Sequence, residues 1–336
     1  MSSIVKTSRQ RFGHSVPRGE LYLNVIKHSL SVIFKGKFNG PLNLVIEITN
    51  QCNLDCVSCY WKRRKLPESL NSKKWGDTIT KIKKKHPGIL VAVWAGGEPM
   101  IRSDLIKKFS EKFITNVVMT NGTFPLVPIR NTQYWVSVDG TKRYYEQQKG
   151  PSYDLVEKNI KKAEEKSIVV TCVLSKINTD CIKEYIEHWT KIKSVRKIVF
   201  AFFTPGARDS NRKYLLSRKE KIQATKEIIK LAKTYPSYLD ETVKFLKVFM
   251  HTRTEKFIKY CHESSMVLVI DSKGREVYHH VNGKNKISCG CPDTNCNECG
   301  THFAMKNNYV HQHRISNLVL YAKRWIERRA LNRSLE

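Results

Sequence analysis

Three cysteines stand close together directly after an apolar segment at 42–48. They are Cys52, Cys56 and Cys59, and their spacing is C-x3-C-x2-C. A loop that leaves the end of a parallel strand lies at the mouth of an α/β barrel, where strand ends position reactive groups. Three thiolates can hold an iron–sulfur cluster. Because a four-iron cluster takes four ligands, one iron would remain open to a ligand from outside the chain.

A second motif, Gly-Gly-Glu-Pro, follows the next apolar segment at 89–95. Alone it indicates only a turn, and three close cysteines alone are also compatible with half of a zinc site. Glycine, which has no Cβ, lets the backbone come close to a ligand. In this order, and each at a strand end, the two motifs are much more specific together. The residues of the second motif are Gly96, Gly97, Glu98 and Pro99.

The two motifs resemble those of the radical S-adenosylmethionine (radical SAM) enzymes. The resemblance implies a catalytic 4Fe-4S cluster on the three cysteines, whose open iron is chelated by the amino and carboxylate groups of S-adenosylmethionine. It implies that residues 96–99 hold the methionine ammonium through backbone carbonyls and Glu98. Reductive cleavage of S-adenosylmethionine then yields a 5'-deoxyadenosyl radical, which abstracts hydrogen from a substrate. One departure is Ser58, where many members carry an aromatic residue that packs on the adenine.

Polar residues at two further strand ends are candidate cofactor contacts. Asn121 follows the segment 116–120, and Ser137 and Asp139 lie at the end of the segment 134–138. The same resemblance implies that they lie near the ribose and the methionine carboxylate. For Ser137 and Asp139, a simple turn that closes the strand is an equal alternative.

Strand-like and helix-like segments alternate along the chain. The strand candidates are rich in Val, Ile and Phe and lie at 42–48, 89–95, 116–120, 134–138, 168–174 and 197–203. Amphipathic stretches between them lie at 73–85, 104–113, 153–166 and 181–192. This alternation predicts a parallel sheet with right-handed crossovers. We therefore expect an α/β fold in which residues 41–215 form a partial (β/α)6 parallel barrel, open on one side, as the resemblance also implies.

A second group of cysteines predicts a metal site in a C-terminal extension at 259–305. A hairpin with its turn at Lys273-Gly274 separates the first of these cysteines from the rest. This layout resembles the SPASM and twitch extensions of radical SAM enzymes, which here would form a small Cys-rich α+β unit. We favour one further iron–sulfur cluster with one spare cysteine, and a structural zinc knot is the alternative. The five cysteines are Cys261, Cys289, Cys291, Cys296 and Cys299.

The remaining segments flank these two units. Residues 1–40 combine a polar arm with an amphipathic helix that places Tyr22, Ile26, Leu30 and Ile33 on one face. This helix is compatible with a membrane surface, but we favour packing across the bottom of the barrel. The pattern of apolar residues at 216–258 predicts a helical layer. Residues 306–336 predict a basic amphipathic helix that is compatible with an anionic surface, although a cap on the barrel is the commoner explanation.

The charge and the cysteine content indicate the class of partner and the cellular compartment of the protein. The chain has 336 residues, and 60 Lys and Arg against 30 Asp and Glu give a formal charge of +30. This excess favours an anionic partner, and charges spread over solvated faces are the alternative. Cysteines in short-spaced clusters indicate metal ligands in a reducing compartment. With no visible signal peptide and no apolar run of about 18 residues, we expect a cytoplasmic, oxygen-sensitive protein with at most peripheral contact with an anionic membrane.

These features together predict a radical SAM enzyme that functionalises an unactivated C–H bond. Such an enzyme needs an external one-electron donor of the ferredoxin or flavodoxin type. The C-terminal extension favours a peptide or protein substrate, whereas the cationic surface favours a lipid or another anionic molecule. The alternative is a non-catalytic zinc protein that binds nucleic acid. Nucleic acid is disfavoured because the basic residues are not interleaved with stacking aromatic residues.

Overall fold

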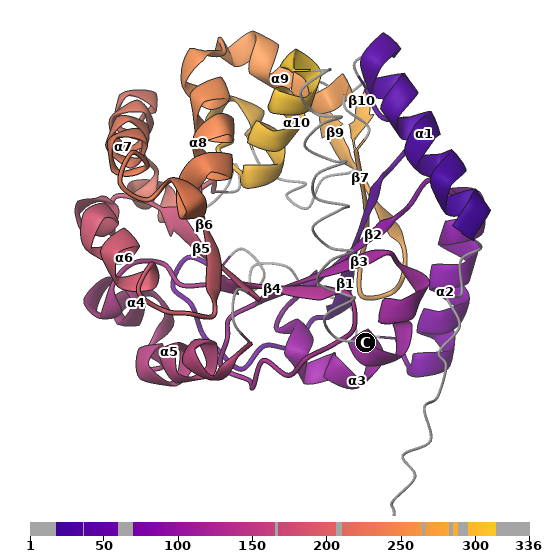
Figure 1. Cartoon of the computed structure of the whole chain (residues 1–336), viewed down its shortest axis with the longest axis horizontal. Coiled ribbons are helices and arrows are strands. Elements are labelled where there is room, and N and C mark those ends of the chain that lie inside the picture. Colours follow the sequence, from indigo (N-terminus) through magenta and orange to yellow (C-terminus); the bar gives the residue numbers. More distant parts are fainter. Residues whose placement is uncertain are drawn as a thin grey trace, which may run out of the picture.

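The computed structural model describes residues 18–35, 37–59, 70–164, 167–205, 210–263, 266–281, 285–287 and 295–313. The predicted N-terminal arm, Cys289, Cys291 and the predicted C-terminal helix beyond residue 313 lie outside these ranges. One large sheet organises the described residues, and helices cover it (Figure 1).

The large sheet has eight strands in the order β6-β5-β4-β3-β2-β1-β7-β8. β1 to β6 follow one another in chain order, and each pairs in parallel with the next. All six therefore deliver their C-terminal ends to one edge of the sheet. The predicted α/β fold with six parallel strands is confirmed, and within the described ranges the sheet stays open. These strands are β1 (Asn43–Thr49), β2 (Val91–Gly96), β3 (Thr115–Thr120), β4 (Thr132–Ser137), β5 (Ile168–Leu174) and β6 (Val195–Phe202).

The helices between these strands bury one face against the sheet. α2 (Ser72–Lys85) begins at Asn71, whose side chain accepts a hydrogen bond from the backbone of the first turn. Trp75, Ile79 and Ile82 follow at helical spacing and are buried. The rest of this layer consists of η2 (Pro99–Arg102), α3 (Ser103–Phe109), η3 (Ser110–Lys112), α4 (Lys142–Lys149), α5 (Tyr153–Lys162), η4 (Thr179–Cys181) and α6 (Ile182–Trp189).

The core lies between the sheet and its helices. Leu44, Ile46 and Ile48 of β1 have no exposed surface, and every other residue of the strand except Val45 is buried as well. Strands that are covered on both faces are typical of parallel sheets. Trp94 of β2 is also fully buried, and its indole Nε1 donates to Asn116 Oδ1 at 3.0 Å. The core thus satisfies a buried polar group between neighbouring strands.

The C-terminal part of the chain extends this same sheet. β7 (Val267–Ile270) pairs in parallel with β1, and β8 (Glu276–Val277) pairs antiparallel with β7. The turn of this hairpin contains Gly274 at a φ of +74°, a conformation that favours glycine. These residues belong to the predicted extension at 259–305. β7 is thus hydrogen-bonded to β1, the strand that precedes the first cysteine motif.

Further helices follow β6 in the chain. They are α7 (Arg218–Leu231), α8 (Pro236–His251) and α9 (Thr254–Glu263), of which α8 contacts β6, and α10 (His302–Gln312) contacts α8, α9 and β6. Ala304 and Met305 of α10 join the main core, so this region shares one core with the barrel. The other described elements are η5 (Ser210–Tyr214), the antiparallel pair β9 (His279–Val281) and β10 (Asn285–Ile287), and η6 (Cys296–Glu298).

α1 (Arg18–Lys35) lies at the N-terminal ends of the strands, which form the bottom of the barrel. Asn24 and His28 hydrogen-bond to the backbone carbonyls of residues 87 and 88, just before β2. The predicted packing face is not the one that packs, because Ile26 and Leu30 are exposed. Among the described helices, none is long and apolar enough to cross a membrane.

Candidate active site

The structure brings the first cysteine motif and the Gly-Gly-Glu-Pro motif together. Thr49 at the end of β1 is the register partner of Gly96 at the end of β2. Gly97 N donates to Thr49 O at 2.9 Å, and Glu98 N donates to Gln51 O at 2.7 Å. Two backbone hydrogen bonds therefore join the turn to the start of the cysteine loop.

The two glycines are required by this close approach. A Cβ on Gly97 would lie 2.0 Å from Gln51 O, and a Cβ on Gly96 would lie 2.2 Å from Thr49 O. Gly96 also has a φ of +123°, a conformation that L side chains rarely adopt. The motif thus holds the cysteine loop against the turn, whatever ligand the two of them bind.

The three thiols of the loop are ligands of the kind that an iron–sulfur cluster takes, but within the described residues they do not gather closely enough to hold one metal ion, so their role as cluster ligands stays a prediction. Cys52 is exposed, whereas Cys56 and Cys59 are half-buried. Cys59 N donates to Cys56 O at 3.2 Å, so a tight turn connects two of the thiols. Burial raises the pKa of Cys56 to about 11 and also raises the pKa of Cys52. Binding of iron must therefore displace protons from these thiols.

Glu98 braces the ends of two strands with its carboxylate. The side chain is 1% exposed. Oε1 accepts hydrogen bonds from Met100 N (2.9 Å) and Thr120 Oγ1 (2.7 Å), and Oε2 accepts one from Asn121 N (2.7 Å). Burial raises the pKa of Glu98, and these three donors oppose that rise. Glu98 therefore already has three partners within the chain, and its predicted contact with the methionine ammonium stays a prediction.

Asn121 lies directly beside the cysteine loop. Its Nδ2 donates to Asn53 Oδ1 at 3.0 Å and lies 4.0 Å from Cys52 Sγ, while its Oδ1 accepts from Thr123 N at 2.9 Å. Asn53 Nδ2 in turn donates to Thr123 Oγ1 at 2.8 Å. Asn53 and Thr123 were absent from the predicted site. Their position next to a motif cysteine and a predicted asparagine was the signal that could have found them.

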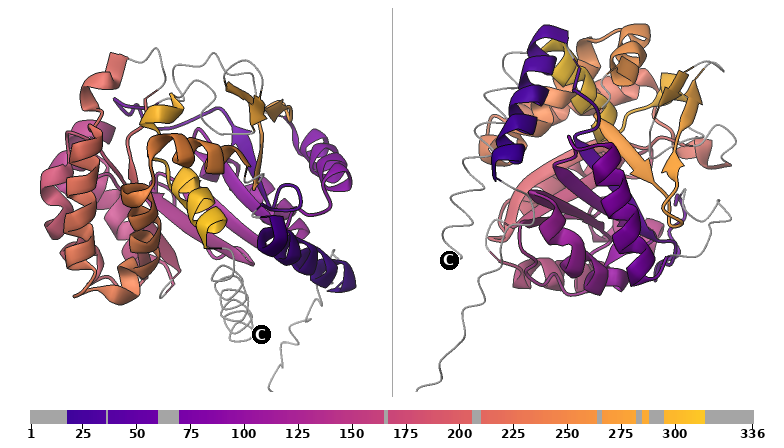
Figure 2. Two further views of the ribbon diagram at one scale, coloured as in Figure 1. Left: turned by 90° about the horizontal axis from the view of Figure 1, so that it is seen from above. Right: turned by 90° about the vertical axis from the view of Figure 1, so that its right-hand side faces the viewer.

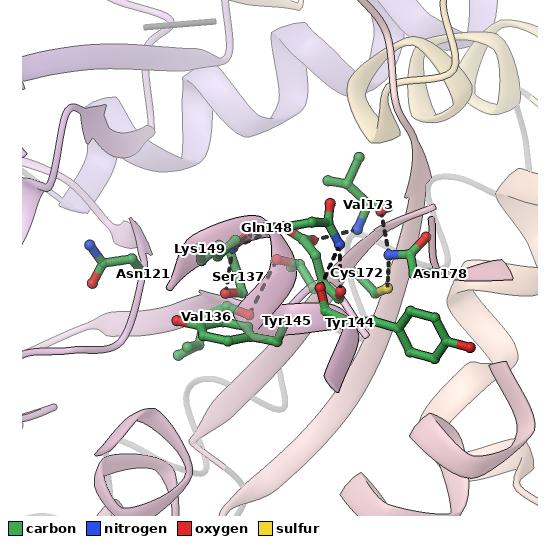
Figure 3. A network of polar contacts seen from close by, with 12 residues as sticks. Asn121, Val136, Ser137, Tyr144, Tyr145, Gln148, Lys149, Cys172, Val173 and Asn178 are labelled. Atoms are coloured by element: carbon green, nitrogen blue, oxygen red, sulfur yellow. Dashed lines mark hydrogen bonds and ion pairs between the residues drawn. The ribbon is translucent and has the colours of Figure 1, made fainter. Parts of the chain in front are cut away.

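Ser137 and Asp139 share a buried ammonium group, that of Lys149 (Figure 3). Lys149 Nζ lies 2.8 Å from Asp139 Oδ2 and donates to Ser137 O (2.8 Å) and Ser137 Oγ (2.7 Å). Asp139 Oδ1 accepts from Val173 N at 2.8 Å, which joins β4 to β5. Burial, the largest single influence, lowers the pKa of Lys149, but Asp139 together with Tyr145 and Cys56 outweighs burial, so the pKa of Lys149 is raised. Ser137 and Asp139, which the sequence suggests as cofactor contacts, therefore belong to a buried cluster around the ammonium group of Lys149.

The end of α4 also holds the cysteine loop. Gln148 O accepts a hydrogen bond from Val57 N at 2.9 Å, between the second and third cysteines. Gln148 Nε2 donates to Asp139 O (3.0 Å) and Tyr144 O (3.1 Å), which fixes the helix end. Lys149 and Gln148 contact the candidate site, and the sequence analysis does not single them out. Gly150, at a φ of +82°, marks the end of the helix but not the inward direction of Lys149.

Three of the five predicted ligands of the second metal site lie within the described ranges. Cys261 is on α9, and Cys296 and Cys299 are on and after η6, which contacts α9. His262 Nε2 lies 3.7 Å from Cys296 Sγ, and its position next to Cys261 was the signal that could have identified it. Within the described residues, no three His, Cys, Asp or Glu side chains gather closely enough for one metal ion. Cys289 and Cys291 are outside those residues.

Hydrogen bonds connect the turn that carries Cys296 and Cys299 to α7 and to the end of β6. Lys221 Nζ donates to Glu298 O at 2.7 Å, and the side chain of Lys221 is buried, which lowers its pKa. Phe202 N at the end of β6 donates to Gly300 O at 2.9 Å. The second cysteine group is therefore positioned by the last parallel strand of the barrel.

Residues 46–192 match the family model described as the Radical SAM superfamily. The sporulation killing factor maturation protein SkfB of Bacillus subtilis (strain 168) is 29% identical over 166 residues, which cover 44% of this chain and 39% of SkfB. The chain thus spans about two fifths of the length of this curated relative.

Two solved structures resemble the fold. Streptococcus suis SuiB bound to precursor peptide SuiA has a TM-score of 0.54 and 15% identity, covering 82% of this chain and 67% of that one. Native anSMEcpe with bound AdoMet and the Cp18Cys peptide has a TM-score of 0.53 and 13% identity, covering 84% and 99%. At these identities the likeness shows the fold alone, a mostly parallel sheet with helices.

Proposed function

The chain belongs to the radical SAM superfamily, and from this we propose that it cleaves S-adenosylmethionine reductively and abstracts hydrogen from a C–H bond of a peptide substrate. The observation that carries the proposal is the pair of hydrogen bonds, Gly97 N to Thr49 O and Glu98 N to Gln51 O, that hold the glycine turn against the cysteine loop. This contact places the thiols beside the turn that the family resemblance assigns to the methionine group. The family match favours this enzyme over the non-catalytic zinc-binding alternative.

We propose Cys52, Cys56 and Cys59 as the ligands of the catalytic cluster, with Asn121 and Glu98 as neighbours of the bound S-adenosylmethionine. When bound, the cluster and S-adenosylmethionine supply the electron and the radical. The chain holds the thiol loop from two sides, through Gln51 O on the turn side and Val57 N on the α4 side. Loop rigidity of this kind keeps the ligands oriented when protons leave and iron enters.

We propose that Asp139 and Ser137 act through Lys149 to shape the same end of the barrel. Their ion pair joins α4, β4 and the first residues past β4 in one buried unit. Because α4 also carries Gln148, which accepts from the cysteine loop, this unit fixes where Cys56 and Cys59 stand. A direct contact of Ser137 or Asp139 with S-adenosylmethionine remains part of this proposal.

The substrate class is proposed from what is known of three similar proteins. SkfB is a maturation protein for a killing factor, SuiB has been solved with a precursor peptide, and anSMEcpe has been solved with a peptide. These descriptions support a peptide more than a lipid. We further propose that Cys261, Cys296 and Cys299, with Cys289 or Cys291, bind a second iron–sulfur cluster, and that an external one-electron donor of the ferredoxin or flavodoxin type reduces the protein.

Anaerobic reconstitution tests the reaction. We expect iron and sulfide to bind, and 5'-deoxyadenosine to form from S-adenosylmethionine under dithionite. Cys56→Ser should abolish this product, whereas the control Cys181→Ser should retain it, because Cys181 is buried and its Sγ donates to Asn178 O at 3.2 Å, which serine can also do. Product formation by Cys56→Ser at the wild-type rate would overturn the ligand assignment.

A comparison of cell extracts tests the substrate. Cells that express the wild-type chain or Cys56→Ser are analysed by mass spectrometry of peptides and of lipids. A mass change in a peptide that depends on Cys56 supports the proposal. A change that is confined to lipids would contradict the peptide class and leave the radical chemistry intact.

A further inference from the structure

α1 turns an apolar face to solvent. Leu23, Ile26, Leu30 and Phe34 are 57%, 52%, 46% and 75% exposed. Their spacing of three and four residues places them on one side of the helix, along about 16 Å of its axis. They are half of the large apolar side chains that the described residues expose. The exposure is thus concentrated on one helix and is not scattered over the surface, as single exposed apolar residues normally are.

Polar contacts fix the opposite face of α1 on the barrel. Asn24 Nδ2 donates to Pro87 O at 3.1 Å, and His28 Nε2 lies 2.7 Å from Gly88 O. A Cβ on Gly88 would come within 2.8 Å of the His28 ring, so this glycine makes room for the contact. Both side chains are buried. The helix therefore cannot roll to bury its apolar face without leaving buried polar groups unpaired.

The positive charge around this apolar face indicates which kind of partner binds there. Lys27 is exposed beside this face, and Lys35 and Lys37 are exposed at and just past the C-terminal end of the helix; the whole chain has a formal charge of +30. A second copy of the chain would bring like charges together, whereas an anionic bilayer offers both negative headgroups and an apolar interior. We propose that α1 docks the protein on an anionic phospholipid membrane, with Leu23, Ile26, Leu30 and Phe34 inserted and the three lysines at the headgroups.

The position of α1 leaves the active site accessible in this docked state. α1 contacts the N-terminal ends of the strands, whereas the cysteine loop follows the C-terminal end of β1. It also lies on the opposite side of the molecule from α6 and α7 (Figure 2). A membrane below α1 is therefore compatible with a peptide substrate that enters from water.

Flotation of the full, cluster-loaded chain with vesicles tests the proposal. We expect at least tenfold stronger partitioning onto vesicles that contain phosphatidylglycerol than onto phosphatidylcholine alone. Leu30→Ser with Phe34→Ser should reduce this partitioning at least tenfold. Leu155→Ser is the matched control, because Leu155 is 46% exposed, as is Leu30, but belongs to α5, which lies far from α1 (Figure 1). Lys27→Gln should weaken binding about fivefold.

Several outcomes would overturn the proposal. One is wild-type partitioning by the Leu30→Ser, Phe34→Ser variant while circular dichroism shows both proteins folded. Another is loss of binding only when residues 314–336 are deleted, since the tail would then be the docking element. A third is self-association that this double variant abolishes in the absence of any vesicle binding, which would assign the face to a second copy.

Discussion

Replacement of Lys149 by methionine tests how the chain holds the walls of its active site. Lys149 Nζ lies 2.8 Å from Asp139 Oδ2, and the two side chains are only 8% and 11% exposed. At this distance their attraction is about 6 kcal/mol for an effective dielectric constant of about 20. The variant leaves the Asp139 carboxylate buried without its counter-charge. We therefore expect the free energy of unfolding to fall by about 3–5 kcal/mol.

Two further variants separate the ion pair from the loss of a side chain. Asp139→Asn combined with Lys149→Met removes both charges, so it should recover a large part of the loss, and the double-mutant cycle then measures the coupling. Lys142→Met is the matched control on the same helix. Lys142 Nζ lies 2.5 Å from Asp154 Oδ2, but the side chains are 52% and 71% exposed, and we expect no measurable change from this exposed pair.

The assay is anaerobic denaturation by urea, followed by the rate of iron release to a chelator. Because Gln148 O accepts from Val57 N, a loosened end of α4 should also release iron faster from the neighbouring cysteine loop. A Lys149→Met protein as stable as Lys142→Met, with unchanged iron release, would refute the reasoning, since the buried pair would then contribute no more than the exposed one.

Three more substitutions, one of them with a control variant, test other contacts. Gly97→Ala drives a Cβ to within 2.0 Å of the backbone oxygen of Gln51, so we expect the free energy of unfolding to fall by about 1–3 kcal/mol and iron retention to weaken. In the control Gly76→Ala in α2, the Cβ would meet only the Phe109 ring at 3.5 Å, and the free energy of unfolding should rise by up to about 1 kcal/mol. Equal melting temperatures for the two variants would contradict this prediction. Glu98→Gln replaces one acceptor with a donor that faces other donors, so thermal unfolding should show a loss of about 1–3 kcal/mol, and unchanged stability would show that the brace is dispensable. Burial lowers the pKa of His302 from 6.5 to about 3. The stabilisation by neutral His302 is therefore complete above pH 6.5, and the free energy of unfolding falls by about 1.4 kcal/mol per pH unit as the pH falls towards 3. His302→Phe should lack this part of the pH dependence, and identical slopes of the free energy of unfolding against pH for variant and wild type would contradict the prediction.

Much of the barrel was predictable from the sequence because its signals are local. Alternating apolar and amphipathic segments predict β1 to β6 and the helices α2, α3, α5 and α6, although not α4, and the strand ends locate both motifs. The contact between Gly97 and Gln51 follows from the parallel pairing of β1 with β2, since neighbouring parallel strands end at the same edge.

The other contacts were not predictable because they depend on packing between distant segments. Lys149 resembles a surface lysine at the end of a helix until Ser137 and Asp139 are placed beside it. The outward face of α1 follows because Asn24 and His28 hydrogen-bond to the carbonyls of residues 87 and 88 on the opposite side of the helix, which leaves Ile26 exposed. Hydrophobic periodicity finds the apolar face of a helix but does not tell which face packs.

The parallel pairing of β1 with β7 has a consequence for how the protein is made. Asn43 Nδ2 lies 3.4 Å from Met266 O, a contact between residues 223 positions apart in the chain. While the ribosome is still synthesising the middle of the polypeptide, β1 has β2 beside it and a bare edge on its other side. Contacts of such long range form late. We therefore expect iron delivery to the first cysteine motif to follow the release of β7 from the exit tunnel, so that cofactor assembly is an event of the finished chain.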